Sequence, residues 1–513
     1  MAAWLDDAVF YEIFPSSFKD SDGDGIGDFR GIVEKLGYIR NLGFNAIRLA
    51  PCFESPFFNG GCDVKDFFDV SGRFGTSGDF DELLLAAKTL GMRVAVDLLP
   101  ICTSSENAMF RRSGENRPNA FSDRFIWTDS VEKDYPDYRV VYGGYERNGA
   151  YMCYKFACQP RLNFGFAEIT ESSWQRHYKD AECVKTRDWL IDVLKYWIER
   201  GVDGFFMLSA GEIVVGDDNG QASAEVWKYV LSGVRKAFPE AVFVSEWGNA
   251  EKAVNGAGFD ADVYSVDRGN GLFRKFSGGI NHSFLGSEGR GDVTAFLRDY
   301  LRQIIPTRKK GRIALVSGSP LDFRLARFYD AEQIKLIMGV LLTLPSIPVV
   351  YYGDELGMKH LDVAPKEGGY YYSGARTPMQ WTDGKNKGFS PEDVPQNKLY
   401  LPVDQSANAP SAGSAFGFGG IADCVKALCR LRTSEKDLST GGFEVEYAER
   451  NKFPFVYRRG RFVICVNPYV MDEDAPSEFE GKPIFAIGGE GSLSGGKCRA
   501  PARSFNIYEI AGN

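Results

Sequence analysis

The stretch that decides the fold is Gly201-Val202-Asp203-Gly204-Phe205-Phe206-Met207-Leu208-Ser209-Ala210. It follows an amphipathic segment, Thr186–Arg200, and Gly201 stands where a helix commonly ends. The apolar run that comes next has the length and composition of a buried strand. Helix, glycine and strand together predict one unit of a parallel sheet covered by helices.

The same order recurs along the 513 residues of the chain. The amphipathic segments Phe29–Leu42 and Phe80–Leu90 are followed by Gly43 and Gly91, and then by short runs rich in apolar residues. Such alternation predicts repeated strand–helix units. The length exceeds one ordinary domain but suits a barrel with added domains.

Several of these runs, taken in order, resemble the barrel strands of the α-amylase family of glycoside hydrolases (family thirteen). The run at Gly201–Ala210 is similar to its fourth strand, which reads G-V-D-G-F-R-L-D-A-A. Other segments with this resemblance are Val9–Pro15, Asn45–Pro51, Val94–Leu99, Val242–Trp247, Ala314–Asp322 and Pro348–Glu355. Gly374–Trp381 (G-A-R-T-P-M-Q-W) is similar to the branch that holds oligo-1,6-glucosidases, sucrose isomerases and trehalose synthases.

The resemblance implies an α/β fold, a (β/α)8 TIM barrel with an inserted lid domain after strand 3 and a C-terminal antiparallel β domain. The helical rhythm is interrupted between Cys102 and about Ser172 and ends after about Ser434. We therefore expect the barrel at 1–101 and 173–434, the lid at 102–172 and the β domain at 435–513. Within the last segment, strands are predicted at Phe443–Tyr447, Phe453–Tyr457, Phe462–Val466 and Phe505–Ile510.

Composition narrows the setting of the protein. The formal net charge is -9 and no basic patch favours nucleic acid. No secretory signal is visible at the start, and the most apolar window, Ile334–Tyr352, contains a lysine and two prolines, which argues against a membrane span. Ten cysteines without C-x-x-C spacing favour reduced thiols in a cytoplasmic protein.

The chemistry of the family requires acidic groups at the ends of barrel strands. A retaining glycosidase needs one carboxylate to attack the anomeric carbon and a second carboxyl group to protonate the leaving oxygen. By resemblance, Leu208 stands at the position of the nucleophile, Phe206 at that of the arginine that holds it, and Glu246 at that of the acid/base. Glu246 is the one family carboxylate that the chain retains.

The remaining positions of the family site are also changed. Leu321 stands at the third carboxylate, and Pro320 and Cys102 stand where the family has histidines. Asp322 lies one residue later, and on an extended segment it would point away from the site. Loss of a nucleophile alone costs on the order of 10⁴ to 10⁶ in rate in comparable enzymes, so we expect the family chemistry to be absent.

Other residues resemble parts of the sugar-binding site. Asp63 and Arg376 match a family pair that grips the terminal glucose hydroxyls; they could hold an α-glucoside or form an ion pair that closes the pocket. Cys62 stands where a tyrosine usually stacks under the sugar, and a buried, inert thiol is the favoured interpretation. For Glu246, both a surviving acid and an inert hydrogen-bonding group stay open.

A glycine-rich acidic loop near the N-terminus predicts a structural calcium site. Hard oxygen ligands come at alternate positions, and Gly31 rules out a complete EF-hand because it takes the place of the bidentate glutamate. The predicted ligands are Asp20, Asp22, Asp24, the carbonyl of Ile26, and Asp28. The alternative is a solvated acidic turn.

Three hypotheses for the function follow. The first is a non-catalytic relative that binds a small α-glucoside or maltooligosaccharide, as a sensor or as the partner of another protein. The second is an active glucosidase or transglucosidase with rearranged acids such as Asp322 or Glu212. The third is a structural protein whose pocket is filled by its own side chains.

Overall fold

The computed structural model describes residues 2–264, 276–277, 280–281, 283–285, 292–417 and 419–510. Its centre is a closed barrel of parallel strands, each hydrogen-bonded to the strands before and after it in barrel order. The barrel strands are β1 (Phe10–Ile13), β2 (Ala46–Leu49), β5 (Arg93–Leu98), β8 (Gly204–Met207), β9 (Val242–Ser245), β10 (Ala261–Tyr264), β13 (Arg312–Val316) and β14 (Ile347–Tyr351). The predicted barrel is confirmed.

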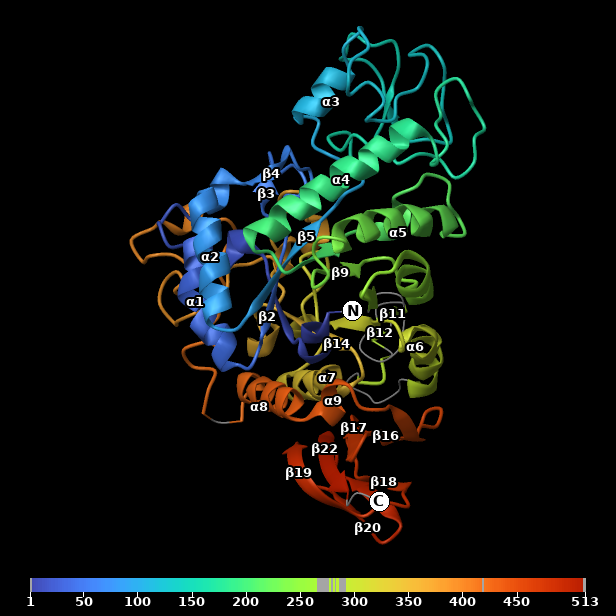
Figure 1. Cartoon of the computed structure of the whole chain (residues 1–513). Helices are drawn as coiled ribbons and strands as arrows, with labels where there is room; N and C mark the ends of the chain where they lie inside the picture. Colours follow the sequence, from blue (N-terminus) through green and yellow to red (C-terminus); the bar gives the residue numbers. More distant parts are fainter. Residues whose placement is uncertain are drawn as a thin grey trace.

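Helices surround the barrel strands, and α2, α4 and α5 are among those labelled in Figure 1. They are α1 (Phe29–Asn41), α2 (Ser77–Thr89), α4 (Ala181–Arg200), α5 (Gln221–Arg235), α6 (Val293–Thr307), α7 (Ala331–Thr343) and α8 (Ile421–Ser434), followed by the short α9 (Lys436–Ser439). Helix α2 begins before the predicted position because Thr76 and Asp79 form a capping box. Helix α4 also begins earlier, at the N-cap Asp180.

The segment between β5 and α4 projects from one end of the barrel, at the top of Figure 1. It contains α3 (Ala108–Ser113) and the short strands β6 (Val140–Val141) and β7 (Tyr151–Met152). Another small pair of strands, β3 (Phe53–Glu54) and β4 (Asp66–Val70), lies earlier in the chain, after β2. Aromatic rings give the projecting segment a core of its own. The Phe110 ring stacks on Trp127 with centroids 5.6 Å apart and meets Tyr151 edge-on at 4.9 Å.

The C-terminal part forms an antiparallel sheet, drawn in red at the bottom of Figure 1. Its strands are β15 (Glu444–Tyr447), β16 (Phe455–Arg459), β17 (Phe462–Asn467), β18 (Glu473–Pro476), β19 (Gly481–Ile487), β20 (Ser492–Ser494), β21 (Lys497–Ala500) and β22 (Ser504–Ile510). A small hairpin elsewhere pairs β11 (Phe276–Ser277) with β12 (Ile280–Asn281). The sheet is fixed to the barrel helices: Thr343 Oγ1 of α7 lies 2.5 Å from Tyr457 Oη of β16.

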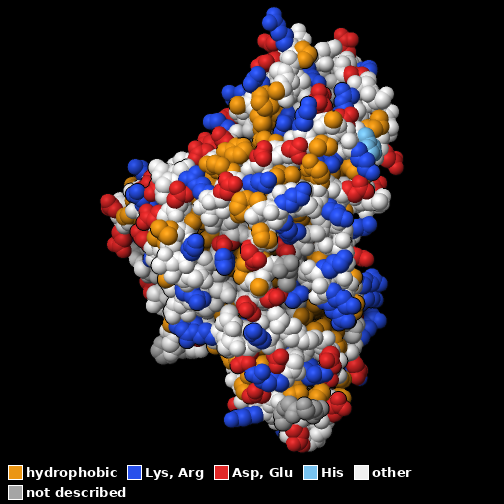
Figure 2. Space-filling model, viewed as in Figure 1, with side chains coloured by type: hydrophobic (Ala, Val, Ile, Leu, Met, Phe, Trp, Pro, Cys, Tyr) orange, Lys and Arg blue, Asp and Glu red, His pale blue; other side chains and the backbone are white. Residues whose placement is uncertain are grey.

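The outer surface mixes both signs of charge. Acidic and basic side chains are interspersed over the face seen in Figure 2. Among the described residues, no helix has the length and apolar character needed to cross a membrane.

The interior of the barrel is built in layers because alternate side chains of each strand point inward. A lower layer is apolar, with Phe10 and Phe206 packed edge to face at 5.3 Å beside small residues such as Ala46 and Ala95. Two residues further along each strand lies what we call the upper interior layer, at the end where the strands finish. Its members are Glu12, Arg48, Asp97, Leu208, Glu246, Val263, Val316 and Tyr351.

Candidate functional site

Arg48 of β2 is the central residue of the upper interior layer. Its Nε and Nη2 donate to the two carboxylate oxygens of Asp97 at 2.7 and 3.0 Å, and Nη2 also donates to Glu246 Oε1 at 3.0 Å. Its Nη1 lies 3.5 Å from Glu12 Oε2. The guanidinium carbon is 4.4 Å from the centre of the Phe206 ring. At 3% exposure, this cation is shielded from solvent and shared among three acids.

The acids around Arg48 have shifted acidities. Burial raises the pKa of Glu12 and of Asp97, although the positive charge of Arg48 opposes the rise in both. Glu12 is completely buried, and its Oε1 has no hydrogen-bond partner among the described residues. Three carboxyl groups therefore surround one arginine at the centre of the barrel end. Protonation of a carboxyl group reduces the excess negative charge there.

Asp97 and Glu246 are two acids that accept hydrogen bonds from the same donor. Both carboxylates lie 3.0 Å from the same nitrogen, Nη2 of Arg48. A retaining glycosidase needs two carboxyl groups about 5 Å apart with the anomeric carbon between them. Here the guanidinium lies between the acids, and Asp97 is only 3% exposed. Asp97 lies within an internal ion cluster, so of this pair only Glu246 reaches the open cleft.

The residues predicted to stand at changed family positions lie in different surroundings. Leu208 follows β8 directly, where its N–H donates to Leu98 O at 2.8 Å. Phe206 and Cys102 are completely buried. Pro320 and Leu321 lie in the turn after β13, and Leu321 is 51% exposed. Phe206 and Glu246 thus both meet Arg48 at the barrel end, while Leu321 is on the rim.

The extended backbone expected at Asp322 is not present. Strand β13 ends at Val316, and Asp322 belongs to a turn in which its N–H donates to Ser319 O at 3.3 Å. Alternation of side chains applies only to extended backbone, so adjacent residues here can face the same way. Leu321 and Asp322 both line the cleft that also contains Glu246.

Asp63 and Arg376 are both withdrawn from solvent. Asp63 is completely buried and accepts hydrogen bonds from the N–H groups of Phe58 and Asn59, each at 3.0 Å. Arg376 is 3% exposed, and its Nε donates to Pro320 O at 2.8 Å. Asp63 is thus engaged by the main chain of its own loop and Arg376 by the main chain of the turn after β13, so a sugar would have to displace existing hydrogen bonds to reach them.

The thiols near this region are not activated. Burial raises the pKa of Cys62 to about 12 and raises the pKa of Cys102 well above its usual range. The nucleophilic form of cysteine is the thiolate, so neither residue is reactive at neutral pH.

An open cleft with a volume of about 530 Å³ lies beside the ion cluster, between the loops that follow β8, β9 and β13. Carboxylates, two lysines and one indole ring dominate its walls. Its lining includes Lys155, Ser209, Glu212, Asp217, Asp218, Glu246, Trp247, Lys252, Leu321 and Asp322. Sugar-sized ligands occupy cavities of this order.

Trp247 is held in the cleft by a buried acid of the neighbouring strand. Asp262 on β10 accepts hydrogen bonds from Ser245 Oγ at 2.6 Å and from the N–H of Trp247 at 2.9 Å. Burial raises the pKa of Asp262 to about 7, against the opposing effect of these donors. The indole also packs against two glycines, since a Cβ at Gly211 would come within 2.5 Å of the ring and one at Gly220 within 3.1 Å. The position of the ring is therefore fixed by both loops.

The predicted calcium loop brings three of its acids together. One carboxylate oxygen from each of Asp20, Asp22 and Asp28 lies within 4.8 Å of the others. Asp24 is outside that group and accepts a hydrogen bond from the N–H of Ile26 at 2.7 Å. Three convergent carboxylates are the donor set that Ca²⁺ favours. The residues present therefore fit the ion, which would brace the loop before α1.

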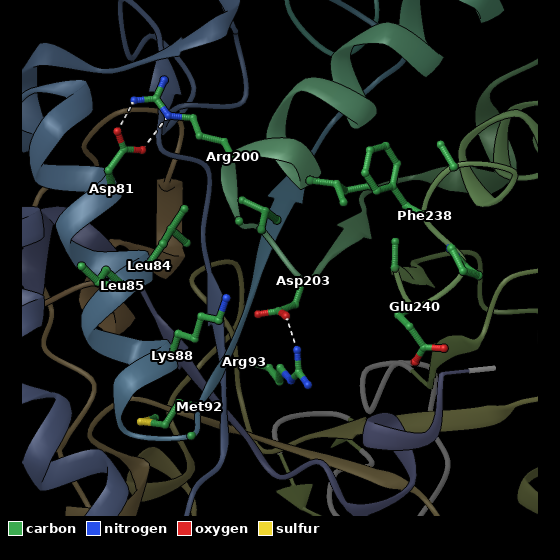
Figure 3. A pocket seen from close by; sticks show the side chains of 17 residues that line it. Asp81, Leu84, Leu85, Lys88, Met92, Arg93, Arg200, Asp203, Phe238 and Glu240 are labelled. Carbon is green, nitrogen blue, oxygen red and sulfur yellow. Dashed lines mark hydrogen bonds and ion pairs between the residues drawn. The ribbon is translucent and has the colours of Figure 1, made fainter.

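A second groove, of about 630 Å³, lies at the opposite end of the barrel (Figure 3). Ion pairs cross it: Arg200 bonds Asp81 at 2.7 Å and Arg93 bonds Asp203 at 2.7 Å. Enzymes built on this barrel carry their sites at the carboxyl end of the strands. The cleft beside Glu246 is thus the candidate functional site.

Comparison with known proteins places the chain in a family. Residues 12–226 and 322–441 match the α-amylase catalytic domain. Maltase A2 of Drosophila melanogaster is 29% identical over 490 residues, covering 86% of this chain and 82% of that protein. The trehalose synthase/amylase TreS of Mycolicibacterium smegmatis is 30% identical, with 79% and 71% covered. An oligo-1,6-glucosidase of Parageobacillus thermoglucosidasius is 26% identical, with 89% and 88% covered.

Solved structures agree on the fold. The trehalulose synthase MutB of Pseudomonas mesoacidophila superposes with a TM-score of 0.83 over the whole of both chains, at 20% identity. The barrel, the C-terminal sheet and the sequence match over most of the chain lead to one conclusion: this protein is a member of the α-amylase family of glycoside hydrolases and transglucosidases.

Proposed function

We propose that this protein binds small α-glucosides in the cleft beside Glu246 without cleaving them by the covalent route of its family. The observation that carries the proposal is the position of Arg48, which lies between Asp97 and Glu246 and bonds both. Leu208, at the end of β8, offers no oxygen to attack an anomeric carbon. With no nucleophile at this position and Glu246 in an ion pair, the two-carboxylate mechanism has neither of its groups ready.

A sugar-binding role draws support from the relatives and from the cleft. The structures of similar fold include trehalulose synthase variants in complex with sucrose and with isomaltulose. In this chain, Trp247 and several carboxylates line a cavity of suitable size. Aromatic rings pack on the apolar face of sugars and carboxylates accept hydrogen bonds from their hydroxyls.

The second candidate is an active glucosidase or transglucosidase that uses rearranged acids. The names of the relatives favour it, because they include maltases and trehalose synthases. So does Asp322, which lines the same cleft as Glu246 and could supply the missing carboxylate. Glu212, on the loop after β8, is another acid in this cleft.

One pair of measurements separates these candidates. Turnover is followed on maltose, isomaltose, sucrose, trehalose and an aryl α-glucoside, and binding of the same sugars is measured by calorimetry. Binding without turnover is the expected result. Turnover that is lost in Glu246→Gln or Asp322→Asn would establish the second candidate. Absence of both binding and turnover would leave a structural role, consistent with the buried Asp63 and Arg376.

We further propose that Asp20, Asp22 and Asp28 bind a structural Ca²⁺. The ion would supply positive charge to a loop whose acids otherwise repel one another. Asp28 also caps α1 by accepting from the N–H of Gly31 at 2.7 Å, so the loop and the first barrel helix are linked. We propose the cytoplasm as the compartment, supported by ten cysteines that all carry free thiols.

A further inference from the structure

The strands of the C-terminal sheet form two layers that face each other. In strand order, β17 and β21 are separated by β22, β19 and β20, yet Cα atoms of β17 and β21 come within 8 Å, so the sheet folds back on itself. One apolar cluster fills the space between the layers. Its buried members come from β16, β17 and β22 on one side and from β18, β20 and β21 on the other: Val456, Val463, Cys465 and Tyr508, and Ala475, Leu493, Cys498 and Ala500.

Each layer contributes one cysteine to this cluster. Alternate residues of a strand face the same side, so Cys465 shares its inward face with Val463 and Cys498 shares its inward face with Ala500. Both cysteines are completely buried and carry free thiols. The two side chains therefore point toward each other from facing layers, as the partners of a disulfide must.

Electrostatic effects within the cluster agree with this placement. Burial raises the pKa of Cys465, and the side chain of Cys498 raises it further. Burial also raises the pKa of Tyr508, and both thiols add to that rise. Each cysteine thus lies close to the other and to the same tyrosine.

We propose that Cys465 and Cys498 are a redox-sensitive pair, which a small-molecule disulfide converts into a covalent bond between the two layers of the C-terminal sheet. The thiolate of one cysteine attacks a sulfur of the small disulfide and releases its first thiol. The second cysteine, once deprotonated, attacks the mixed disulfide and releases the other thiol. Two electrons and two protons thus pass to the small disulfide, which leaves as two thiols, and one S–S bond forms in the protein.

The bond would form slowly and would stabilise the domain. Exchange requires a thiolate and access to it, and here both sulfurs are buried. Strand β18 is an edge of the sheet and pairs with β21, so local opening at this edge uncovers the strand that carries Cys498. Once formed, the bond closes the segment between residues 465 and 498 and restricts the unfolded chain.

The test incubates the full chain, purified in its reduced state, with an excess of glutathione disulfide. Trypsin cuts between the two cysteines, after Lys497, so the bond appears in mass spectrometry as a peptide containing Cys465 joined to the dipeptide Cys498-Arg499. That linked peptide is the expected result. The melting temperature is expected to rise by about 5 °C and to return to its initial value after reduction with dithiothreitol.

Variants locate the effect. Cys465→Ala and Cys498→Ala each remove one sulfur and should abolish both the linked peptide and the rise in melting temperature. Each variant is compared with its own reduced form, since the loss of a buried thiol changes the starting stability. Cys183→Ala is the matched control: Cys183 is also completely buried, but it lies in α4 with its Sγ 3.6 Å from Asn163 Oδ1. This variant should retain both responses.

The contrary outcomes are equally clear. If the folded chain yields no linked peptide, the proposed oxidation is wrong, and refolding from urea in the same buffer shows whether the positions of the sulfurs or the access to them prevented it. A bond between Cys465 and a different cysteine would also overturn the pairing. A rise in melting temperature that persists in Cys498→Ala would refute the link between this bond and stability.

Discussion

Replacing Arg48 by leucine should destabilise the protein strongly, although the change removes a buried charge from the interior of the barrel. Both hydrogen bonds that Asp97 accepts among the described residues come from Arg48, and Glu246 and Glu12 lose their nearest cation. Breaking a buried ion pair by removing one partner costs about 3–5 kcal/mol, because the other charge stays buried without compensation. We expect a loss of about 4 kcal/mol in the free energy of unfolding, measured by urea denaturation.

The matched control is Arg93→Leu. Arg93 begins β5, is 51% exposed and pairs with Asp203 at 2.7 Å (Figure 3). Exposed pairs contribute about 0–1 kcal/mol, so this variant should be nearly neutral.

The pH dependence of the Arg48→Leu variant provides an independent check. Without the arginine, the pKa of Asp97 and of Glu12 should rise further, since the charge that lowers both is gone. The acids then take up protons in the folded state as the pH falls, so the loss should be smaller at pH 5 than at pH 8. The double variant Arg48→Leu/Asp97→Asn should recover part of it. A loss below about 1 kcal/mol, or one that is equal at both pH values, would refute the central role of this ion cluster.

Three further predictions concern other parts of the chain. Leu208→Asp should lower the free energy of unfolding by about 1–3 kcal/mol, seen as a lower melting temperature, without restoring turnover, since it adds an acid to a layer whose arginine is already shared; higher stability or activity on a glucoside would contradict this. Burial raises the pKa of Glu355 to about 7 from an ordinary 4.5, although hydrogen bonds from Tyr11 and Tyr38 oppose the rise. Between pH 4.5 and pH 7 the folded protein therefore keeps the Glu355 proton that the unfolded chain has lost. Stability should therefore fall by about 1.5 kcal/mol as the pH rises from 5.5 to 7, and Glu355→Gln should flatten that slope in melting curves; an equal slope in the variant would disprove it. Calcium at about 100 times its dissociation constant should add about 2.7 kcal/mol of stability relative to chelator, and Asp20→Asn should abolish this increment; an increment that persists in the variant would place the ion elsewhere.

The sequence predicts the barrel well because its strands and helices have strong local signals. Strand β8 follows an amphipathic helix that ends at Gly201, whose φ of 116° is left-handed as a C-cap requires. Helix starts were less accurate, since α4 is capped by Asp180 several residues before its apolar period becomes clear. Strand β10 was not predicted at all: Ala261–Tyr264 contains a buried acid, Asp262, that interrupts its apolar pattern.

The site was less predictable because its key contact joins distant residues. The replacements predicted at Phe206 and Leu208 come from one strand, but the partner of Phe206 is Arg48, which comes from another strand. A charged residue inside the apolar run Asn45–Pro51 was the available signal. No local pattern shows that such an arginine points into a barrel and meets Asp97 there.

The changes at the barrel end are linked physically, and this bears on whether one substitution can restore catalysis. Phe206 gives the guanidinium of Arg48 a flat apolar surface at 4.4 Å, whereas a second arginine at that position would place two cations against each other. An acid at Leu208 would join a layer in which Glu12 already has a raised pKa, so it would share a proton rather than attack a sugar. If the protein is non-catalytic as proposed, we expect recovery of the family mechanism to require the removal of Arg48 together with the return of the acid, and each step alone to lower stability. The ion cluster around Arg48 packs the barrel end stably in place of a catalytic pair of acids. We therefore expect the function of the protein to lie in binding at the adjacent cleft.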